Sequence, residues 1–171
     1  MKEGNVGLVL ESYQDLFSDF DPRPLSSRGL SSDFLEEAER ATRDKPEGFE
    51  LNLLVPKKLR EEKKEVIIRK RLEKHFEKHR EEENRTHKKV IKNGLAFVFF
   101  GIIIMISASL ILYYGSKTTI FTSFLVILLE PAGWFLFWEG LDLIIFKSKR
   151  GSKRRSFYSK MAQADINFKS Y

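Results

Sequence analysis

The chain of 171 residues contains no cysteine, which excludes disulfide bonds and thiolate metal sites. Several enzyme motifs are missing as well: there is no glycine-rich phosphate loop, no nucleophile elbow and no pair of carboxylates in a soluble context. The sequence also contains no internal repeat. From these absences we expect a protein that is not an enzyme and that carries no cofactor.

Charge is missing from one long stretch. Residues 93–116, between Lys92 and Lys117, contain no charged side chain, and the 20 residues 95–114 read LAFVFFGIIIMISASLILYY. At about 1.5 Å per residue, a helix of this length spans roughly 30 Å, the thickness of the hydrocarbon core of a bilayer. The stretch therefore predicts a transmembrane helix.

A second apolar run covers residues 120–146 and contains three acids, Glu130, Glu139 and Asp142. Only residues 115–119 separate it from the first run, and five residues suffice to connect two antiparallel helices. A soluble second helix would leave the first one without a partner. The two runs together predict a transmembrane helical hairpin.

Lysine and arginine flank the open end of the hairpin much more than its turn. Lys88, Lys89 and Lys92 precede the first run, whereas the turn contains only Lys117. Because such residues are retained on the cytoplasmic side, both termini are expected in the cytoplasm of a multi-pass protein of the plasma (inner) membrane. The first six residues contain no apolar segment, so no cleavable signal peptide is expected. The basic residues after the second run are Lys147, Lys149, Arg150, Lys153, Arg154 and Arg155.

The net charge of +6 is concentrated in this basic run, residues 147–155. An anionic membrane surface contributes about 1 kcal/mol for each basic residue near it, so these side chains are expected to contact lipid headgroups. A surface for nucleic acid would interleave aromatic with basic side chains, and residues 147–155 contain no aromatic. The expected partner is therefore a bilayer with anionic headgroups, and not a nucleic acid.

The residues before the hairpin are expected to form a small cytoplasmic domain. Residues 7–13 fit a strand and the start of a helix equally well, whereas residues 19–28 hold two prolines and predict a loop. A Ser-Ser-Asp sequence is typical of a helix N-terminus and predicts a short helix over residues 31–43. Alternating apolar residues then predict a strand over residues 49–55.

Residues 57–93 contain no proline or glycine and predict one long helix that runs almost into the membrane. Its first half carries an apolar stripe that must be buried against the strand or a neighbouring subunit. Every side chain from residue 77 to 89 is polar, which is typical of a stalk exposed to solvent. The stripe consists of Leu59, Val66, Ile67, Leu72 and Phe76.

The end of the chain is expected to form a further strand that pairs with residues 49–55. This pairing would make a small α+β cytoplasmic domain from both ends of the chain. The predicted fold is thus a mainly α membrane protein in three parts. Residues 1–93 form the cytoplasmic N-terminal domain with the long helix, residues 94–146 the transmembrane hairpin, and residues 147–171 a basic cytoplasmic tail.

Glu130 is the first candidate for a functional residue. Matching residues across the hairpin sets it opposite Ile104, near the middle of the bilayer, where a charge usually faces a bundle interior or a water path. Pro131 removes the hydrogen bond to the carbonyl of Ile127 and leaves an acceptor beside the acid. These groups are candidates for an ion or proton pathway. Alternatively, Glu130 is protonated and bonds a hydroxyl such as that of Ser107.

Glu139 and Asp142 lie three residues apart and therefore on one face of the second helix. They are expected at the level of Leu95 and Lys92, where an ion pair at the membrane interface would orient the hairpin. If identical chains surround an axis, the two acids would instead form a negative ring at the cytoplasmic mouth of a pore. The two tryptophans of this helix are expected to serve as packing or interface anchors.

The three histidines of the chain form a row with Glu83: His75, His79, Glu83 and His87 recur every four residues. A pair at this spacing, such as His75 and His79, can chelate a divalent metal. The row extends over about 18 Å, so no single ion can bind all four side chains. A solvated helix face and a pH-responsive stalk are the alternatives.

Three segments carry a resemblance to a known family. They are FDPRPLSSRGLSSDFLEE at residues 20–37, FELNLLVPKKLREEKKEVIIRKRLEKHF at residues 49–76, and GWFLFWEGLDLIIF at residues 133–146 with the trailing KRRSFYSKMAQADI. In these segments, which cover most of the chain, the sequence resembles a family of uncharacterised prokaryotic membrane proteins. The resemblance implies two transmembrane helices and a cytoplasmic N-terminal segment.

A second resemblance is limited to Glu130 and Pro131. They resemble the Glu-Pro pair in the pore helix of the mitochondrial calcium uniporter. Ile127 stands where that motif has a preceding acid.

We therefore expect a non-enzymatic integral membrane protein that forms a homo-oligomer through its cytoplasmic domain and hairpin. The small soluble core and the incompletely buried stripe favour self-association. The alternative is an ion or proton channel with Glu130 in the conduction path. An enzyme ranks third and would require a metal at His75 and His79.

Overall fold

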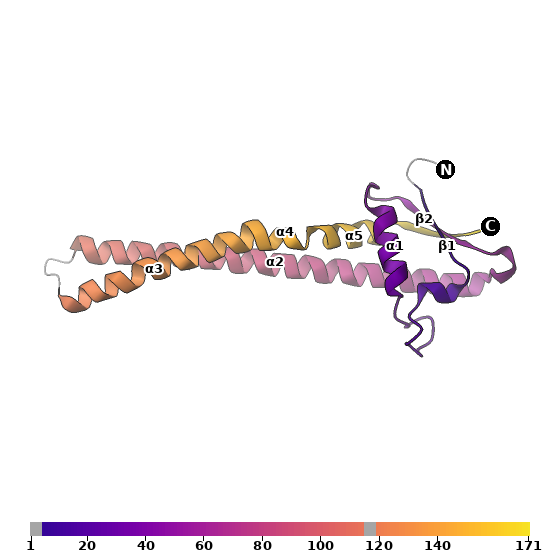
Figure 1. Ribbon diagram of the computed structural model, residues 1–171, viewed down its shortest axis with the longest axis horizontal. Coiled ribbons are helices and arrows are strands. Elements are labelled where there is room, and N and C mark those ends of the chain that lie inside the picture. Colours follow the sequence, from indigo (N-terminus) through magenta and orange to yellow (C-terminus); the bar gives the residue numbers. More distant parts are fainter. Residues whose placement is uncertain (1–4, 115–118) are drawn as a thin grey trace. The chain divides into compact units, whose positions relative to one another are not determined.

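A computed structural model describes residues 5–114 and 119–171 of the chain (Figure 1). It is mainly helical, with a small sheet and two long apolar helices, which confirms those parts of the predicted fold class. Lys117, the lysine expected in the turn of the hairpin, and the first four residues lie outside the described residues. The elements are β1 (Val6–Val9), η1 (Tyr13–Leu16), α1 (Ser32–Thr42), β2 (Glu50–Val55), η2 (Lys57–Leu59), α2 (Glu62–Tyr114), α3 (Ile120–Asp142), η3 (Leu143–Lys147), α4 (Ser148–Arg150), α5 (Ser152–Ala162) and β3 (Asp165–Ser170).

The chain forms two compact units. The first, called here the sheet unit, consists of Met1–Glu82 and Lys153–Tyr171, and the second, called the hairpin unit, consists of Glu83–Ser152. This division follows packing, whereas the predicted division of the chain follows the expected membrane boundary. The three predicted parts stay a prediction.

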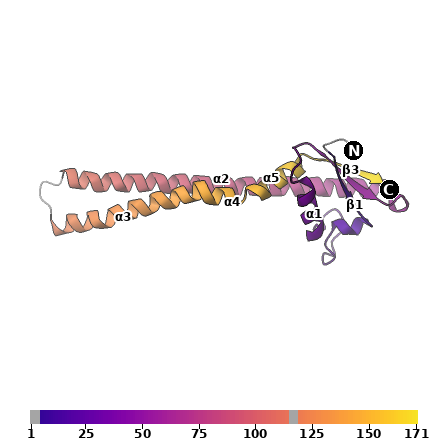
Figure 2. The same cartoon turned by 45° about the horizontal axis from the view of Figure 1, so that its top comes forward.

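The sheet unit contains three parallel strands in the order β1-β2-β3. Leu53 in the central strand is paired with Leu8 on one side and Phe168 on the other, so strands from the two ends of the chain flank β2. Figure 2 labels these two outer strands, β1 and β3, near the N and C marks. The predicted strand at residues 49–55 and its pairing with a strand at the end of the chain are thereby confirmed. The open question over residues 7–13 is settled as a strand that ends at Val9 and a short helix that begins at Tyr13.

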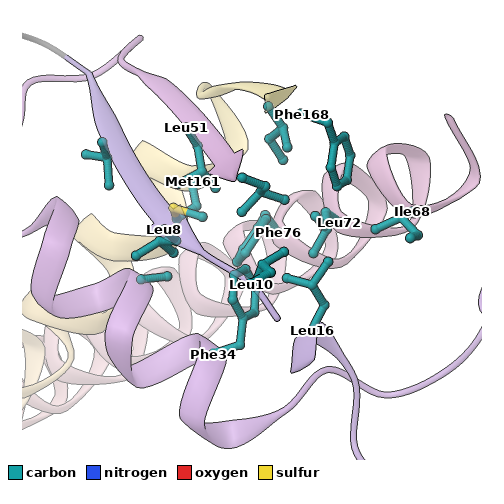
Figure 3. Close-up of a cluster of buried hydrophobic side chains, with 14 of the residues drawn as sticks. Leu8, Leu10, Leu16, Phe34, Leu51, Ile68, Leu72, Phe76, Met161 and Phe168 are labelled. Carbon is teal, nitrogen blue, oxygen red and sulfur yellow. The ribbon is translucent and has the colours of Figure 1, made fainter. Parts of the chain in front are cut away.

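One hydrophobic core holds the sheet unit together. It lies between the strands and the helices, and Figure 3 shows Leu51, Phe76 and Met161 meeting there from β2, α2 and α5. The predicted short helix is α1, whose Phe34 and Ala38 are buried one turn apart. Each fully buried side chain of leucine or phenylalanine size contributes roughly 1.5–3 kcal/mol.

The apolar stripe of α2 differs from the predicted one. Ile68, Leu72 and Phe76 are fully buried, whereas Val66 and Ile67 are 46% and 44% exposed. Steps of four residues keep the buried side chains on one helix face, and residues 66 and 67 fall beside it. Leu59 is also exposed, because it belongs to η2 and α2 begins only at Glu62.

The hairpin unit consists of the second part of α2 packed antiparallel against α3 (Figure 1). The helices meet at small residues: a Cβ placed on Gly101 would lie 2.7 Å from the backbone nitrogen of Phe137, and one on Gly140 would lie 2.7 Å from the carbonyl oxygen of Gly94. Small side chains allow this close approach of two backbones. Gly94, Gly101 and Ala108 recur every seven residues on α2, as do Val126, Gly133 and Gly140 on α3, and all are buried.

Both helices of the hairpin unit are long and apolar enough to span a membrane, with candidate spans in Glu62–Tyr114 and Ile120–Arg150. Only 11% of the most apolar window of each helix is buried. A core helix of a soluble protein would be mostly buried. The apolar side chains that remain exposed include Phe99, Leu112, Phe121 and Phe135.

Candidate functional site

Glu130 lies on the exposed surface of the hairpin unit, in the middle of α3. A Cβ on Gly133 would lie 2.6 Å from Cγ of Met105, so Glu130, one turn earlier, is about level with Ile106. No hydrogen bond or ion pair among the described residues involves its carboxylate. Ser107, the partner named in the sequence-based alternative, instead donates to the carbonyl of Ile103 at 2.8 Å.

Pro131 sits inside α3 without ending it. Because proline has no amide hydrogen, the carbonyl of Ile127 lacks its usual helical donor and is available beside Glu130. Trp134 and Trp138 follow at steps of four residues, so the acid and both tryptophans share one helix face. Their rings are stacked with centroids 5.7 Å apart, and both side chains are more than half exposed.

Glu139 and Asp142 both form ion pairs with Lys147. The Nζ atom of Lys147 lies 2.8 Å from Oε1 of Glu139 and 3.5 Å from Oδ2 of Asp142. Within residues 5–114 and 119–171, one cation therefore pairs with two acids, and the predicted ring would carry about one net negative charge per copy.

A π-helical turn, η3, places Lys147 over these acids. In an uninterrupted α-helix, the residue seven after Glu139 lies on its face, and that residue is Phe146. The wider turn holds one extra residue, so Lys147 takes this position. On the helix face of Glu139, the ammonium group of Lys147 therefore takes the position that the ring of Phe146 would have at the end of the apolar run.

The basic run is divided between the two units. Lys149 and Arg150 belong to the hairpin unit, where they line a hollow of about 560 Å³ with Asp142 and Phe146. Lys153, Arg154 and Arg155 belong to the sheet unit, at the start of α5. Arg154 lies over the ring of Tyr158, with 5.7 Å between its Cζ atom and the ring centroid. Lys149, Arg150, Lys153 and Arg154 are exposed, as contact with headgroups requires.

His75 and His79 lie together on α2, with ring centroids 4.1 Å apart. His79 stacks on Tyr158, and its Nδ1 atom lies 2.9 Å from the carbonyl oxygen of His75. Burial lowers the pKa of His75 to about 4, so this ring is neutral at pH 7. The described part of the chain contains no group of three or more side chains that could hold a metal, and a metal on this pair alone stays a prediction.

One polar cluster in the sheet unit was not predicted. Arg60 binds the carboxylate of Glu65 through two hydrogen bonds of 2.9 and 2.8 Å, and the hydroxyl of Tyr13 donates to the same carboxylate at 2.8 Å. Arg60 lowers the pKa of Glu65, and burial raises the pKa of Tyr13. The backbone amide of Glu61 donates to the tyrosine oxygen, so the cluster ties the start of α2 to η1.

Tyr13 lies 52 positions from Glu65 and 48 from Glu61, and no local spacing signals these two contacts. A cavity of about 520 Å³ lies beside it, lined by Lys57, Arg69 and Ser170 as well as by Arg60 and Glu65. Ser170, the last residue of β3, places this cavity at the carboxyl edge of the sheet, and the cavity is open to solvent.

Comparison of the chain with models of protein families, with curated proteins and with solved structures found no match.

Proposed function

We propose that this protein is a non-enzymatic, two-pass integral membrane protein of the plasma (inner) membrane that assembles into a homo-oligomer. The hairpin unit would be the anchor, and the sheet unit would lie in the cytoplasm with both termini. Two features support the membrane topology: the apolar spans are almost unburied, and both ends of the hairpin return to one three-stranded sheet. Because that sheet lies on one side of a membrane, the chain must cross the bilayer an even number of times.

The observation that carries the oligomer is the exposed, unpaired carboxylate of Glu130. A charged side chain near the middle of a bilayer costs about 2.5–3.5 kcal/mol on insertion scales, and such residues almost always face a bundle interior or water. A single hairpin has only two helices and buries neither Glu130 nor the adjoining tryptophans. Neighbouring copies packed on this face of α3 would remove the acid from lipid.

Native mass measurement in mild detergent and in lipid nanodiscs tests this proposal. The expected result is a discrete oligomer, a multiple of the 20.0 kDa chain. Single-cysteine variants sharpen the test, because the chain contains no other cysteine. Trp134→Cys, on the Glu130 face, should form cross-links between copies, whereas Phe99→Cys on α2 is the exposed control. Monomers alone in both environments would contradict the proposal.

A second candidate function is an ion or proton channel, favoured by the unpaired Ile127 carbonyl beside Glu130. Copies that surround an axis with this face inward would line a path with carboxylates at mid-depth and with Glu139 and Asp142 near its mouth. Purified protein in liposomes should then conduct, and Glu130→Gln should abolish the flux while the mass of the oligomer is unchanged. Equal flux from both forms would exclude Glu130 from any conduction path.

The basic run is proposed to bind anionic headgroups. An integral protein stays with vesicles of any lipid, so the test compares which lipids remain bound to the purified protein. Native mass spectra should show phosphatidylglycerol retained over phosphatidylcholine, and the preference should fall when Lys149 and Arg150 are both changed to Gln. Unchanged lipid retention would remove these two side chains from the headgroup contact.

A further inference from the structure

Among the residues that the structure describes, helices cover one face of the sheet and leave the other uncovered. The side chains on this face, among them Leu8, Leu53 and Phe168, are buried in one core with residues of α1, α2 and α5. The strand order β1-β2-β3 accounts for this arrangement, because right-handed crossovers that advance in one direction keep the connecting helices on one side. Within the described residues, no side chain of the opposite face belongs to the core.

The opposite face, called here the open face, carries a mixed set of side chains. All-parallel sheets occur almost only with both faces covered, so a sheet of this type with one uncovered face is unusual. Val9 is 65% exposed on it. The open face consists of Gly7 and Val9 from β1, Glu50, Asn52 and Leu54 from β2, and Asp165, Asn167 and Lys169 from β3.

Asn52 occupies the centre of the open face, between Gly7 and Asn167 on the neighbouring strands. It is only 4% exposed, and its Oδ1 atom has no hydrogen-bond donor among the described residues. A buried acceptor without a donor costs about 1–3 kcal/mol. The Oδ1 atom exposes less than 1 Å² in a single copy, so an amide donor from a partner removes this cost when the Asn52 side chain turns outward.

The charges of the open face are arranged so that the face complements itself. Glu50 and Asp165 lie at the amino end of their strands, and Lys169 lies at the carboxyl end of β3. Asp165 and Lys169 are about 13 Å apart along the strand, too far for an ion pair within one copy. A second sheet stacked with antiparallel strands about a two-fold axis places Lys169 over Asp165 of the other copy and Asn52 over Asn52. Stacking with parallel strands would instead place Glu50 over Glu50.

We infer that the open face is a contact between two copies of this chain, stacked with antiparallel strands and with the two Asn52 amides paired on the axis. This inference rests on the proposed homo-oligomer and assigns it a cytoplasmic contact surface. Three short strands offer less than the roughly 800 Å² per partner of a standard stable interface. Hairpins held in the same membrane raise the local concentration of the sheets, so a small contact suffices.

Cross-linking of the full chain in nanodiscs tests the surface. Asn167→Cys lies on the open face, and its counterpart in the other copy would be its nearest cysteine. A bismaleimide that spans the roughly 10 Å between stacked sheets should cross-link it at least about fivefold more than Glu39→Cys, an exposed control on α1. Equal cross-linking at the two positions would overturn the inference.

Charge reversal tests the orientation in the same protein. Lys169→Asp, added to Asn167→Cys, places like charges opposite each other and should reduce the cross-link at least about fivefold. Adding Asp165→Lys exchanges the two charges and should restore it. Failure of the exchange to restore the cross-link, while hydrogen exchange shows a folded sheet unit, would overturn the antiparallel arrangement.

The native mass of each variant separates this inference from the proposed function. An oligomer that persists without an open-face cross-link overturns the contact surface and leaves the oligomer in place. Monomers in nanodiscs overturn both.

Discussion

The sheet unit and the hairpin unit form their internal contacts in opposite ways. In the sheet unit, large side chains fill the space between elements, and Leu53, Leu72 and Phe76 are completely buried. In the hairpin unit, the helices approach where side chains are smallest, at Gly101 and Gly140. Water drives the burial of large apolar side chains, whereas helices in lipid, the environment proposed for the hairpin unit, gain little from that effect and depend on close van der Waals contact. The two units should therefore respond to opposite kinds of substitution.

Removal of a large side chain should produce the largest effect, and only in the sheet unit. Phe76→Ala leaves a cavity in the core and should cost about 3–5 kcal/mol. Hydrogen exchange should become faster in β2 and α1, while exchange in α3 is unchanged. Val66→Ala is the matched control and should have little effect, because Val66 is exposed and lies about three turns earlier on α2. Equally faster hydrogen exchange in both units would contradict the difference between their internal contacts.

Addition of a single methyl group should damage only the hairpin unit. Gly101→Ala places a Cβ against the backbone of Phe137 and should cost about 1–3 kcal/mol. Gly133→Ala should cost less, because the nearest atom belongs to the flexible side chain of Met105. Both tryptophans of the chain lie in α3, so their fluorescence during titration with a denaturing detergent measures the hairpin selectively. A larger loss from Gly133→Ala would refute this account of the packing.

Acid should weaken the sheet unit before the hairpin unit. The pKa of His75 is lowered from 6.5 to about 4 by burial, with His79, Arg71 and Lys78 adding to the shift. The unfolded chain therefore takes up this proton first, and stability falls as the pH drops from 6.5 to 4 and is constant above that window. The expected loss is on the order of 1–3 kcal/mol.

His75→Phe is the control for the acid effect, because it keeps a ring in the core without a titrating group. Thermal unfolding of the sheet unit, monitored by hydrogen exchange at pH values from 7 to 5, should show a smaller loss of stability for this variant. Measurement above pH 5 keeps the protonation of Glu65 out of the comparison, since the pKa of that carboxyl is lowered below 4.5. An identical pH profile for both proteins would assign the acid effect to another group.

The smallest effect is expected where the hairpin unit carries its ion pairs. Lys147 pairs with Glu139 and Asp142 at a surface position, and such pairs contribute about 0–1 kcal/mol. Lys147→Ala should therefore leave the detergent titration almost unchanged. If the assembly conducts cations, the same variant should increase flux, because two acids at the mouth lose their only cation within the described part of the chain. A large loss of stability would show that the π-helical turn depends on these pairs.

Patterns of apolar residues predicted most of the fold. The alternation at residues 49–55, the charge-free run at 95–114 and the N-terminal signals of α1 each depend on neighbouring residues, and all appear as elements of the expected kind. A strand at the end of the chain was predicted from Ile166 and Phe168, and its proposed pairing with residues 49–55 is confirmed. Burial on α2 was predicted less well, because Val66 and Ile67 adjoin Ile68 and only the three-dimensional packing selects Ile68.

The features that stayed hidden depend on distant partners or on backbone geometry. The hydrogen bond of Tyr13 to Glu65 joins η1 to α2, and the π-helical turn that redirects Lys147 has no residue signature. The close packing of the hairpin did leave a signal: glycines recur at a seven-residue interval in both apolar runs. The location of Glu130 in the middle of α3 was expected, and its role stays a prediction.

The position of β2 between β1 and β3 sets the order in which the protein can be completed. A ribosome releases β1 and β2 early, then both hairpin helices, and the strand that completes the sheet last. Until then, Ile166 and Phe168 are missing from the core, and Leu51 and Leu53 lack one flank. The sheet unit therefore cannot be completed before both hairpin helices have been synthesised, and under the proposed topology a chain whose hairpin failed to return across the bilayer would carry an unfinished sheet that proteases can recognise.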